Sequence, residues 1–307
     1  MEDRENIYDI SFSLLRFVIR LEKGGNLPKD KESAIRGAIL NVLYDRYCDS
    51  DRNCDSCDHR DDCMAHGIKF PKYKIEPYFK SESIGNVLEC ENKNRDFRLG
   101  DRIQFRILLF GQGIDNAGIW ISAARKAGKL GLGKEHLTYI LEYVYDRHDR
   151  PVYKDGVFKK EEIVPECLSD YIYERKRVIG RPDRLDIRFI SPVTIKFQKK
   201  FVQLLTADAI IESMARRIYS LNCYVGNSIE YPYVLVEELP DQGYESSWKM
   251  SVRRYSEPKR KLMTMKGLKG RIELYNGDDR ILNLIIACEL THIGKNASFG
   301  FGKYEIS

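Results

Sequence analysis

The residues from 184 to the end of the chain alternate between strand-like and helix-like segments, and this order constrains the fold more than any other feature. The six segments are, in order, 184–197, 198–221, 248–256, 262–275, 280–290 and 297–306. Four of them are rich in β-branched and aromatic residues or alternate in polarity, which is typical of strands. The second and fifth are apolar at helical spacing, and the fifth, RILNLIIACEL, must be largely buried. The resulting βαββαβ order predicts a ferredoxin-like domain.

The first half of the chain allows the same order. Strand-like and helix-like segments alternate at 10–21, 31–47, 84–90, 102–110, 118–128 and 137–145. We therefore predict an α+β chain of two tandem ferredoxin-like domains, the first over 1–165 and the second over 183–307. The two should be joined within 160–183, and the first should carry a small cysteine-rich insertion at 48–63.

The composition favours a globular protein without a membrane partner. Of 307 residues, 43% are hydrophobic and 11% aromatic, which is enough for two packed cores and argues against disorder. The N-terminus, MEDRENIYD, lacks the apolar core of a signal peptide, and no run of about 18 apolar residues could span a membrane. We expect a cytoplasmic protein.

The positive charge lies in the second half of the chain. The net charge is +5, and residues 1–150 contain 25 basic and 25 acidic residues. Residues 249–271 contain nine basic residues, and only Glu257 opposes them. Such a cationic segment fits a polyanion such as nucleic acid. The alternative is a solvated basic hairpin with no ligand.

A second cationic element, HIGKNASFGFGKYEIS at 292–307, is rich in glycine. Glycine lets backbone N–H groups approach phosphate closely. The five residues between Gly294 and Gly300, followed by Phe301 and Gly302, do not match a nucleotide P-loop. FGQGIDN at 110–116 lacks the third glycine of a dinucleotide site. We therefore predict no nucleotide cofactor.

Half of the eight cysteines are clustered. Cys48, Cys54, Cys57 and Cys63 fall within sixteen residues, which in a reducing compartment favours a metal over disulfides. Four thiolates suit a structural zinc, and an iron–sulfur cluster is the second choice. His59 could replace one ligand, or the site could be empty. Residues 45–62 carry seven Asp and three Arg, so we expect a clip that ends the first helix and repels RNA.

Two stretches of the chain resemble a known family. RYSEPKRKLMTMKGLKG, then a buried helix and HIGKNASFGFGKY, is similar to the CRISPR-associated endoribonucleases that process precursor CRISPR RNA, members of the repeat-associated mysterious protein (RAMP) superfamily. AIRGAILNVLY followed by cysteines resembles a cysteine-containing branch. The resemblance implies tandem ferredoxin-like domains and sequence-specific, metal-independent cleavage of CRISPR repeat RNA. It implies attack by the 2′-hydroxyl, which leaves 2′,3′-cyclic phosphate and 5′-hydroxyl ends.

This reaction needs cations around the phosphate and groups that transfer protons. The predicted RNA-binding residues are Arg253, Arg254, Tyr255, Arg260, Lys261, Gly294, Lys295, Gly300, Gly302 and Lys303. Among them, Tyr255 could stack on a base. Arg36 is a weaker candidate because an arginine on a helix is often only solvated.

The acid–base group should be a histidine. In many relatives the catalytic histidine lies in or just after the first helix, and this chain has no histidine in that helix, Ser33–Tyr47. His292, beside the glycine-rich loop, and His66, just after the last clustered cysteine, are the candidates. For His292 the alternative is a buried residue that caps a helix. A site without histidine also stays open.

Two other classes of function compete with the endoribonuclease. A non-catalytic RAMP-type subunit of a CRISPR effector complex would bind the same RNA through the same residues. A small-molecule enzyme fits the fold but not the cationic segment.

Overall fold

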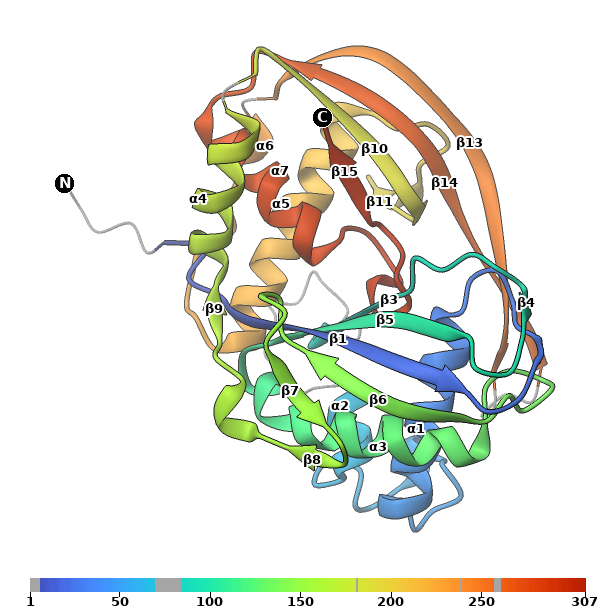
Figure 1. Ribbon diagram of the computed structural model, residues 1–307. Coiled ribbons are helices and arrows are strands. Elements are labelled where there is room, and N and C mark those ends of the chain that lie inside the picture. Colours follow the sequence, from blue (N-terminus) through green and yellow to red (C-terminus); the bar gives the residue numbers. More distant parts are fainter. Residues whose placement is uncertain (1–5, 70–83, 181, 238, 257–260) are drawn as a thin grey trace.

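The computed structural model describes the chain except for residues 1–5, 70–83, 181, 238 and 257–260 (Figure 1). Two antiparallel sheets dominate it, one built by each half of the chain. Helices cover one face of each sheet, and the long strands β13 and β14 arch from the second sheet down beside the first domain (Figure 1).

The first sheet has the strand order β3-β5-β1-β6-β7-β8, and β9 pairs with β1. Its strands are β1 (Ser11–Leu21), β3 (Asn86–Glu89), β5 (Arg102–Phe110), β6 (Tyr139–Tyr145), β7 (Pro151–Lys154), β8 (Val157–Phe158) and β9 (Glu166–Cys167). Helices α1 (Glu32–Tyr47) and α3 (Ala117–Leu130) cover one face, and the short α2 (Met64–Lys69) follows the cysteine segment. A two-stranded ribbon, β2 (Gly25–Asn26) with β4 (Asp96–Phe97), lies outside this sheet.

Alternation along β1 explains how this sheet packs. Leu15, Phe17 and Ile19 are buried in the core, while the side chains between them lie on the other face. Phe17 is directly opposite Phe105 of β5, and their rings stack with centroids 4.8 Å apart. Such a pair contributes roughly 0.5–1.5 kcal/mol beyond the burial of its area.

The second sheet has the order β13-β14-β10-β15. Its strands are β10 (Arg184–Val193), β13 (Asp241–Ser256), β14 (Lys261–Tyr275) and β15 (Tyr304–Ile306), and its helices are α5 (Ala207–Val225), α6 (Val234–Glu237) and α7 (Asp279–Thr291). Asp278 caps α7 by accepting hydrogen bonds from the N–H groups of Arg280 and Ile281. Most of α7 is buried, as its apolar sequence predicts.

Both sheets place the four strands of a βαββαβ unit in the spatial order 2-3-1-4, so the prediction of two tandem ferredoxin-like folds is confirmed. Three details differ from the sequence prediction. The predicted helix at 198–221 begins only at Ala207, because Lys196–Phe197 (β11) and Lys200–Phe201 (β12) form a hairpin whose turn residues have positive φ. Only Tyr304–Ile306 of the segment 297–306 is a strand. An unpredicted helix, α4 (Leu168–Ile179), lies between the two sheets in sequence.

One hydrophobic core joins the two domains. Ile10, Phe12 and Phe110 of the first sheet pack in the same cluster as the buried faces of α5 and α7. The domain junction is therefore a packed interior rather than a hinge over solvent. Within the described part of the chain, no helix combines the length and apolarity needed to cross a membrane.

Candidate functional site

The glycine-rich loop joins α7 to β15 at the junction of the domains, and its short 3-10 turn η4 (Ala297–Phe299) packs against β3 and α1. Gly300 has a φ of +77°, and a Cβ there would lie 2.8 Å from the carbonyl oxygen of Leu88 in β3. Gly302 has a φ of +75°, and its Cβ would lie 1.9 Å from the carbonyl oxygen of Ile293. Both positions therefore require glycine for close packing, whatever else the loop contacts.

His292 is fully buried at the end of α7. Its Nδ1 lies 2.9 Å from the carbonyl oxygen of Phe301, and its Nε2 lies 2.8 Å from Oε1 of Glu89 in β3. A carbonyl oxygen only accepts hydrogen bonds, so Nδ1 donates to Phe301, and Nε2 faces the Glu89 carboxylate. The ring thus links the glycine-rich loop to the first domain and has no nitrogen left for a substrate.

Glu89 is the centre of a closed network of charges. Its Oε2 accepts a hydrogen bond from Lys303 Nζ at 2.7 Å, and Lys303 also donates to Glu91 at 2.9 Å. Arg106 of β5 lies 2.6 Å from Glu91 and 3.6 Å from Glu89. Burial alone would raise the pKa of Glu89, but the hydrogen bond and charge of His292 and the charge of Lys303 outweigh it and hold the pKa far below its usual range.

A second cluster of charge lies on the ring of Phe299 in η4. Arg36 of α1 and Arg254 of β13 each place the guanidinium carbon 4.6 Å from the centroid of this ring. Burial, and then the charge of Arg254, lowers the pKa of Arg36 to about 10, while Tyr44 opposes this change. Burial also lowers the pKa of Arg254. Within the described residues, no carboxylate lies within 4.0 Å of Arg254.

Sequence reasoning missed the partners that organise both clusters. Glu89 stands in the buried strand NVLE, and a carboxylate in such a strand signals a partner from elsewhere in the fold. Phe299 gave no signal, because a phenylalanine beside glycines is as easily explained by packing. Arg36 was the weaker candidate on the sequence, but it is buried at the domain junction.

The remaining predicted RNA-binding residues are more dispersed. Arg253 and Lys261 are exposed on the long ribbon, and Lys295 lies 5.8 Å from the ring centroid of Phe201. A Cβ on Gly294 would lie 2.6 Å from the carbonyl oxygen of Thr194, so close packing accounts for this glycine too. Arg260 and the side chain of Tyr255 lie outside the described residues.

His66 is half-buried in α2 and lines a cavity of about 180 Å³ formed by the cysteine segment. Lys69, three residues further along the same helix, donates a hydrogen bond to the hydroxyl of Tyr44 at 2.8 Å. Residues three apart share one side of a helix. Tyr44 in turn acts on the pKa of Arg36, so α2 is connected through α1 to the arginine pair.

The cysteine segment does not form the predicted zinc site. Cys48 Sγ accepts a hydrogen bond from the backbone N–H of Arg52 at 3.2 Å, and Cys63 Sγ lies 3.7 Å from the carbonyl oxygen of Tyr47. Cys54 shares a hydrogen bond with Tyr44. In the part of the chain that the structure describes, no three His, Cys, Asp or Glu side chains are grouped to hold a metal ion. The structural zinc prediction is therefore not supported, although all four cysteines line the same cavity of about 180 Å³.

The segment still helps to end the first helix. Cys48 is the C-cap residue of α1, and its backbone N–H donates to the carbonyl oxygen of Tyr44. Cys48, Cys54 and Cys63 pack against the core of the first domain. The packing of these partly buried thiols against the core helps to hold the segment in place.

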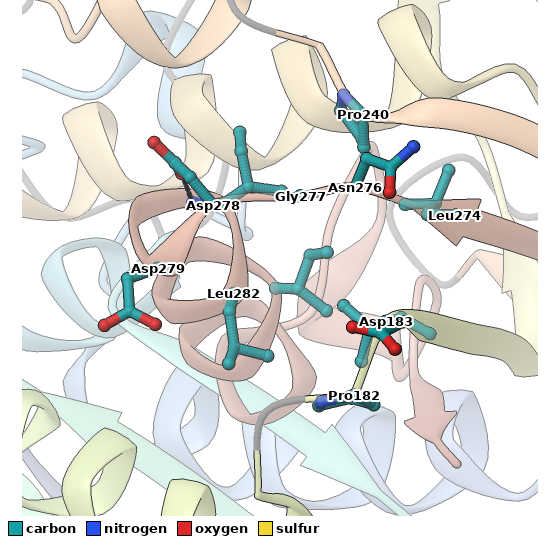
Figure 2. Close-up of a pocket in the computed structure, with 12 residues that line it drawn as sticks. Pro182, Asp183, Pro240, Leu274, Asn276, Gly277, Asp278, Asp279 and Leu282 are labelled. Carbon is teal, nitrogen blue, oxygen red and sulfur yellow. Dashed lines mark hydrogen bonds between the residues drawn. The ribbon is translucent and has the colours of Figure 1, made fainter.

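A cavity of about 460 Å³ lies elsewhere, at the start of α7. Figure 2 shows the carboxylates of Asp183, Asp278 and Asp279 among the side chains that line it. Negative charge of this kind repels phosphate. The cavity is thus a poor candidate for binding a polyanion, and the domain junction with its arginine pair is the better one.

Comparisons with known proteins agree with this architecture. Residues 187–304 match the family model of the CRISPR-associated endoribonuclease Cas6, and residues 10–166 match the family model AF_1859_N, described as an N-terminal domain. Among curated proteins, none matches the sequence.

Solved structures share the fold at low sequence identity. A chain of a partial Cas6-RT-Cas1–Cas2 complex has a TM-score of 0.61 and 13% identity over 97% of this chain, which spans only 46% of that one. A Cas6 product complex has a TM-score of 0.56 and 12% identity, covering 96% of this chain and 99% of that one. A Thermus thermophilus Cas6 has a TM-score of 0.50 and 12% identity, covering 97% and 99%.

The chain belongs to the family AF_1859_N through residues 10–166, which make up about half of it. Residues 187–304 are similar to the CRISPR-associated endoribonuclease Cas6, and the tandem fold is the one found in the solved Cas6 structures. None of the comparisons bears on the cysteine-containing branch, which stays a prediction.

Proposed function

We propose that the chain is a metal-independent endoribonuclease that cuts CRISPR repeat RNA within the precursor transcript. One observation carries the proposal: Arg36 and Arg254, from different domains, both lie on the ring of Phe299 in the glycine-rich loop. Two like charges on one ring, one buried and one half-buried, repel each other, and a phosphate between or beside them relieves that repulsion. The scissile phosphate therefore binds at Arg36 and Arg254.

The reaction needs only the RNA and the side chains around it. The 2′-oxygen of the nucleotide before the cut forms a bond to phosphorus and loses its proton, while the bond from phosphorus to the 5′-oxygen breaks and that oxygen gains a proton. The products are a 2′,3′-cyclic phosphate and a 5′-hydroxyl. Arg36 and Arg254 stabilise the added negative charge of the phosphorane, which is the electrostatic work that a metal ion performs in other nucleases.

The two histidine candidates have different roles. His292 anchors the glycine-rich loop to Glu89 and so positions Phe299 under the arginines; it is a positioning residue, because both of its nitrogens are used. His66 is the histidine proposed for proton transfer. Its support is the connection from α2 to Arg36 through Lys69 and Tyr44.

Cations of the long ribbon and of the glycine-rich loop bind the RNA backbone on either side of the cut. Arg253 and Lys261, which are exposed on the ribbon, and Lys295 in the loop supply charge without reading sequence. Arg260, outside the described residues, is proposed for the same role. Affinity should therefore fall steeply with salt, as counterions are released from each neutralised phosphate. Tyr255 is the proposed stacking residue of this group.

The partner is CRISPR repeat RNA, and larger assemblies are a further proposal. The likeness to a chain of a Cas6-RT-Cas1–Cas2 complex, of which this chain spans less than half, supports association with other CRISPR proteins. An effector complex that keeps the processed RNA is one such assembly.

The test uses the full chain and its own repeat RNA in EDTA. Cleavage at a single position, with a 2′,3′-cyclic phosphate on the 5′ fragment, is expected. A 2′-deoxy substitution at that position should abolish cleavage and leave binding intact. Tight binding with no cleavage of the all-ribose RNA would instead support the non-catalytic RNA-binding subunit.

A further inference from the structure

Trp248 is an exposed aromatic residue that the catalytic proposal does not use. It stands on β13, the edge strand of the second sheet, with 53% of its surface exposed. The only other tryptophan of the chain, Trp120, is 2% exposed in the first core. An exposed indole on an edge strand is available to stack on a ligand, and the charges around it decide which kind.

The register of the ribbon puts Trp248 on the same face as the arginine pair. Alternate residues of a strand share a face, so Trp248, Val252 and Arg254 point to one side of β13. Val252 packs with Phe301 and Phe299 of the glycine-rich loop, and Arg254 lies on Phe299. Trp248 therefore lies on the same face of the ribbon as Arg254, further along β13 from the domain junction.

Positive charge surrounds the indole. Lys269 of β14 is directly opposite Trp248. Burial, then the charges of Lys29 and Lys93 from the first domain, lowers the pKa of Lys269, and Asp30 opposes this. Lys93 is paired with Asp30 at 3.2 Å. Among the described residues, no carboxylate lies within 4.0 Å of Lys29 or Lys269, so these two lysines carry the net positive charge of the patch.

The distance along β13 from Arg254 to Trp248 sets how many nucleotides lie between the cut phosphate and a base stacked on the indole. Six residues separate Arg254 from Trp248, which at about 3.3 Å per residue is roughly 20 Å along β13. A stacked RNA strand advances roughly 3.4 Å per nucleotide, so about six stacked nucleotides, or fewer extended ones, cover this distance.

We propose that Trp248 is a base-stacking platform for single-stranded RNA, within about six nucleotides of the cut phosphodiester, with Lys29 and Lys269 neutralising the flanking phosphates. This inference rests on the proposed function. An indole beside unpaired cations suits an unpaired base with its phosphate better than it suits an apolar protein partner.

The test uses the intrinsic fluorescence of the tryptophans. In Trp120→Phe, Trp248 is the sole emitter, and its emission should fall as repeat RNA with a 2′-deoxy nucleotide at the cut binds. In Trp248→Phe, the emission of buried Trp120 should not respond. Binding of the same RNA with unchanged Trp248 emission would overturn the proposal.

Affinity gives the second readout. Trp248→Ala should weaken binding about 5- to 150-fold, and Trp248→Phe should retain most of the affinity. In wild-type protein, an abasic nucleotide at one position within about six of the cut should cost as much as Trp248→Ala, and the two losses should not add. Equal affinities of wild type and Trp248→Ala would overturn the proposal. If Trp248 responds to RNA but the RNA is never cut, only the proposed catalysis fails; if RNA does not bind at all, both fail.

Discussion

Two clusters of charge meet at the glycine-rich loop, and they are built in opposite ways. Around Glu89, three cationic side chains lie near two carboxylates, and His292 is enclosed completely. Around Phe299, the buried guanidinium of Arg36 and the half-buried one of Arg254 face one aromatic ring, and burial, then the charge of Arg254, lowers the pKa of Arg36. The first cluster pairs its charges within the protein, whereas we propose that the second binds a phosphate.

We infer from this difference that the Glu89 cluster stabilises the fold and that the Phe299 cluster serves the reaction. A buried ion pair is costly to break, because the remaining charge is left without compensation. Like charges held close together repel each other, and perturbed charged groups are concentrated at functional sites. One side of the loop therefore fixes the domains together, and we propose that the other side binds phosphate.

The largest expected effect on stability comes from removing the charge of Glu89 at the centre of the first cluster. Glu89→Gln leaves His292 and Lys303 without their buried carboxylate, and should lower the free energy of unfolding by about 3–5 kcal/mol. The matched control is Glu91→Gln, whose side chain is 60% exposed and should cost about 1 kcal/mol or less. Urea unfolding of wild type and the two variants measures the free energy of unfolding. Similar losses in Glu89→Gln and Glu91→Gln would show that the buried pairing of Glu89 does not stabilise the fold.

The same cluster predicts how stability depends on acid. The pKa of Glu89 in the folded protein is far below its ordinary value of 4.5, so its contribution is present above that pH and is lost as the pH falls below it. Wild type should therefore lose stability relative to Glu89→Gln between about pH 4.5 and the onset of acid unfolding. Parallel pH curves for the two proteins would contradict the pairing.

Removing one of the two arginine charges on Phe299 should have a smaller effect, and it should raise the free energy of unfolding rather than lower it. Arg254→Met removes one of two like charges while keeping an apolar contact on Phe299, and should raise the free energy of unfolding by about 1 kcal/mol. Arg253→Met, on the exposed face of the same strand, should change it by less than about 0.5 kcal/mol. Thermal unfolding in phosphate-free buffer is the measurement. A loss of several kcal/mol in Arg254→Met would mean that this cluster, too, is architectural.

The cysteine segment should give the smallest effect. Cys57→Ser removes a thiol for which the structure gives no bonded partner inside the segment, and we expect a change in unfolding free energy of at most about 1 kcal/mol. EDTA should leave the melting temperature unchanged. Stoichiometric zinc in freshly purified protein, released together with a large loss of stability, would restore the metal site.

The sequence was sufficient for the order of elements but not for the partners across the junction. Periodicity located α7 and both βαββαβ units, because a buried helix and an alternating strand leave local patterns. The start of α5 was misplaced, since the hairpin at 196–201 also presents apolar side chains at helical spacing. Glycines in the loop suggested phosphate contact, whereas close packing against Leu88 and Ile293 is a constraint visible only in three dimensions.

The sequence predicted the region of the candidate site better than it predicted the individual residues. Cationic segments far apart in sequence do meet at the junction through Arg254 and the loop. Local spacing could not show that His292 would be sealed between Glu89 and Phe301, nor that Arg36 would join Arg254 on one ring. The clustered cysteines show a different limit, because spacing typical of a metal site does not fix where each sulfur points, and the zinc prediction is not supported.

The central claim is that the Arg36–Arg254 pair holds the phosphate that is cut, and single-turnover cleavage with saturating protein in EDTA tests it most directly. Arg254→Met should slow the chemical step roughly 100- to 1,000-fold, the cost of losing one preorganised donor, while Arg253→Met stays within a few-fold of wild type. Equal rates for Arg254→Met and wild type, with RNA fully bound in both, would contradict the claim.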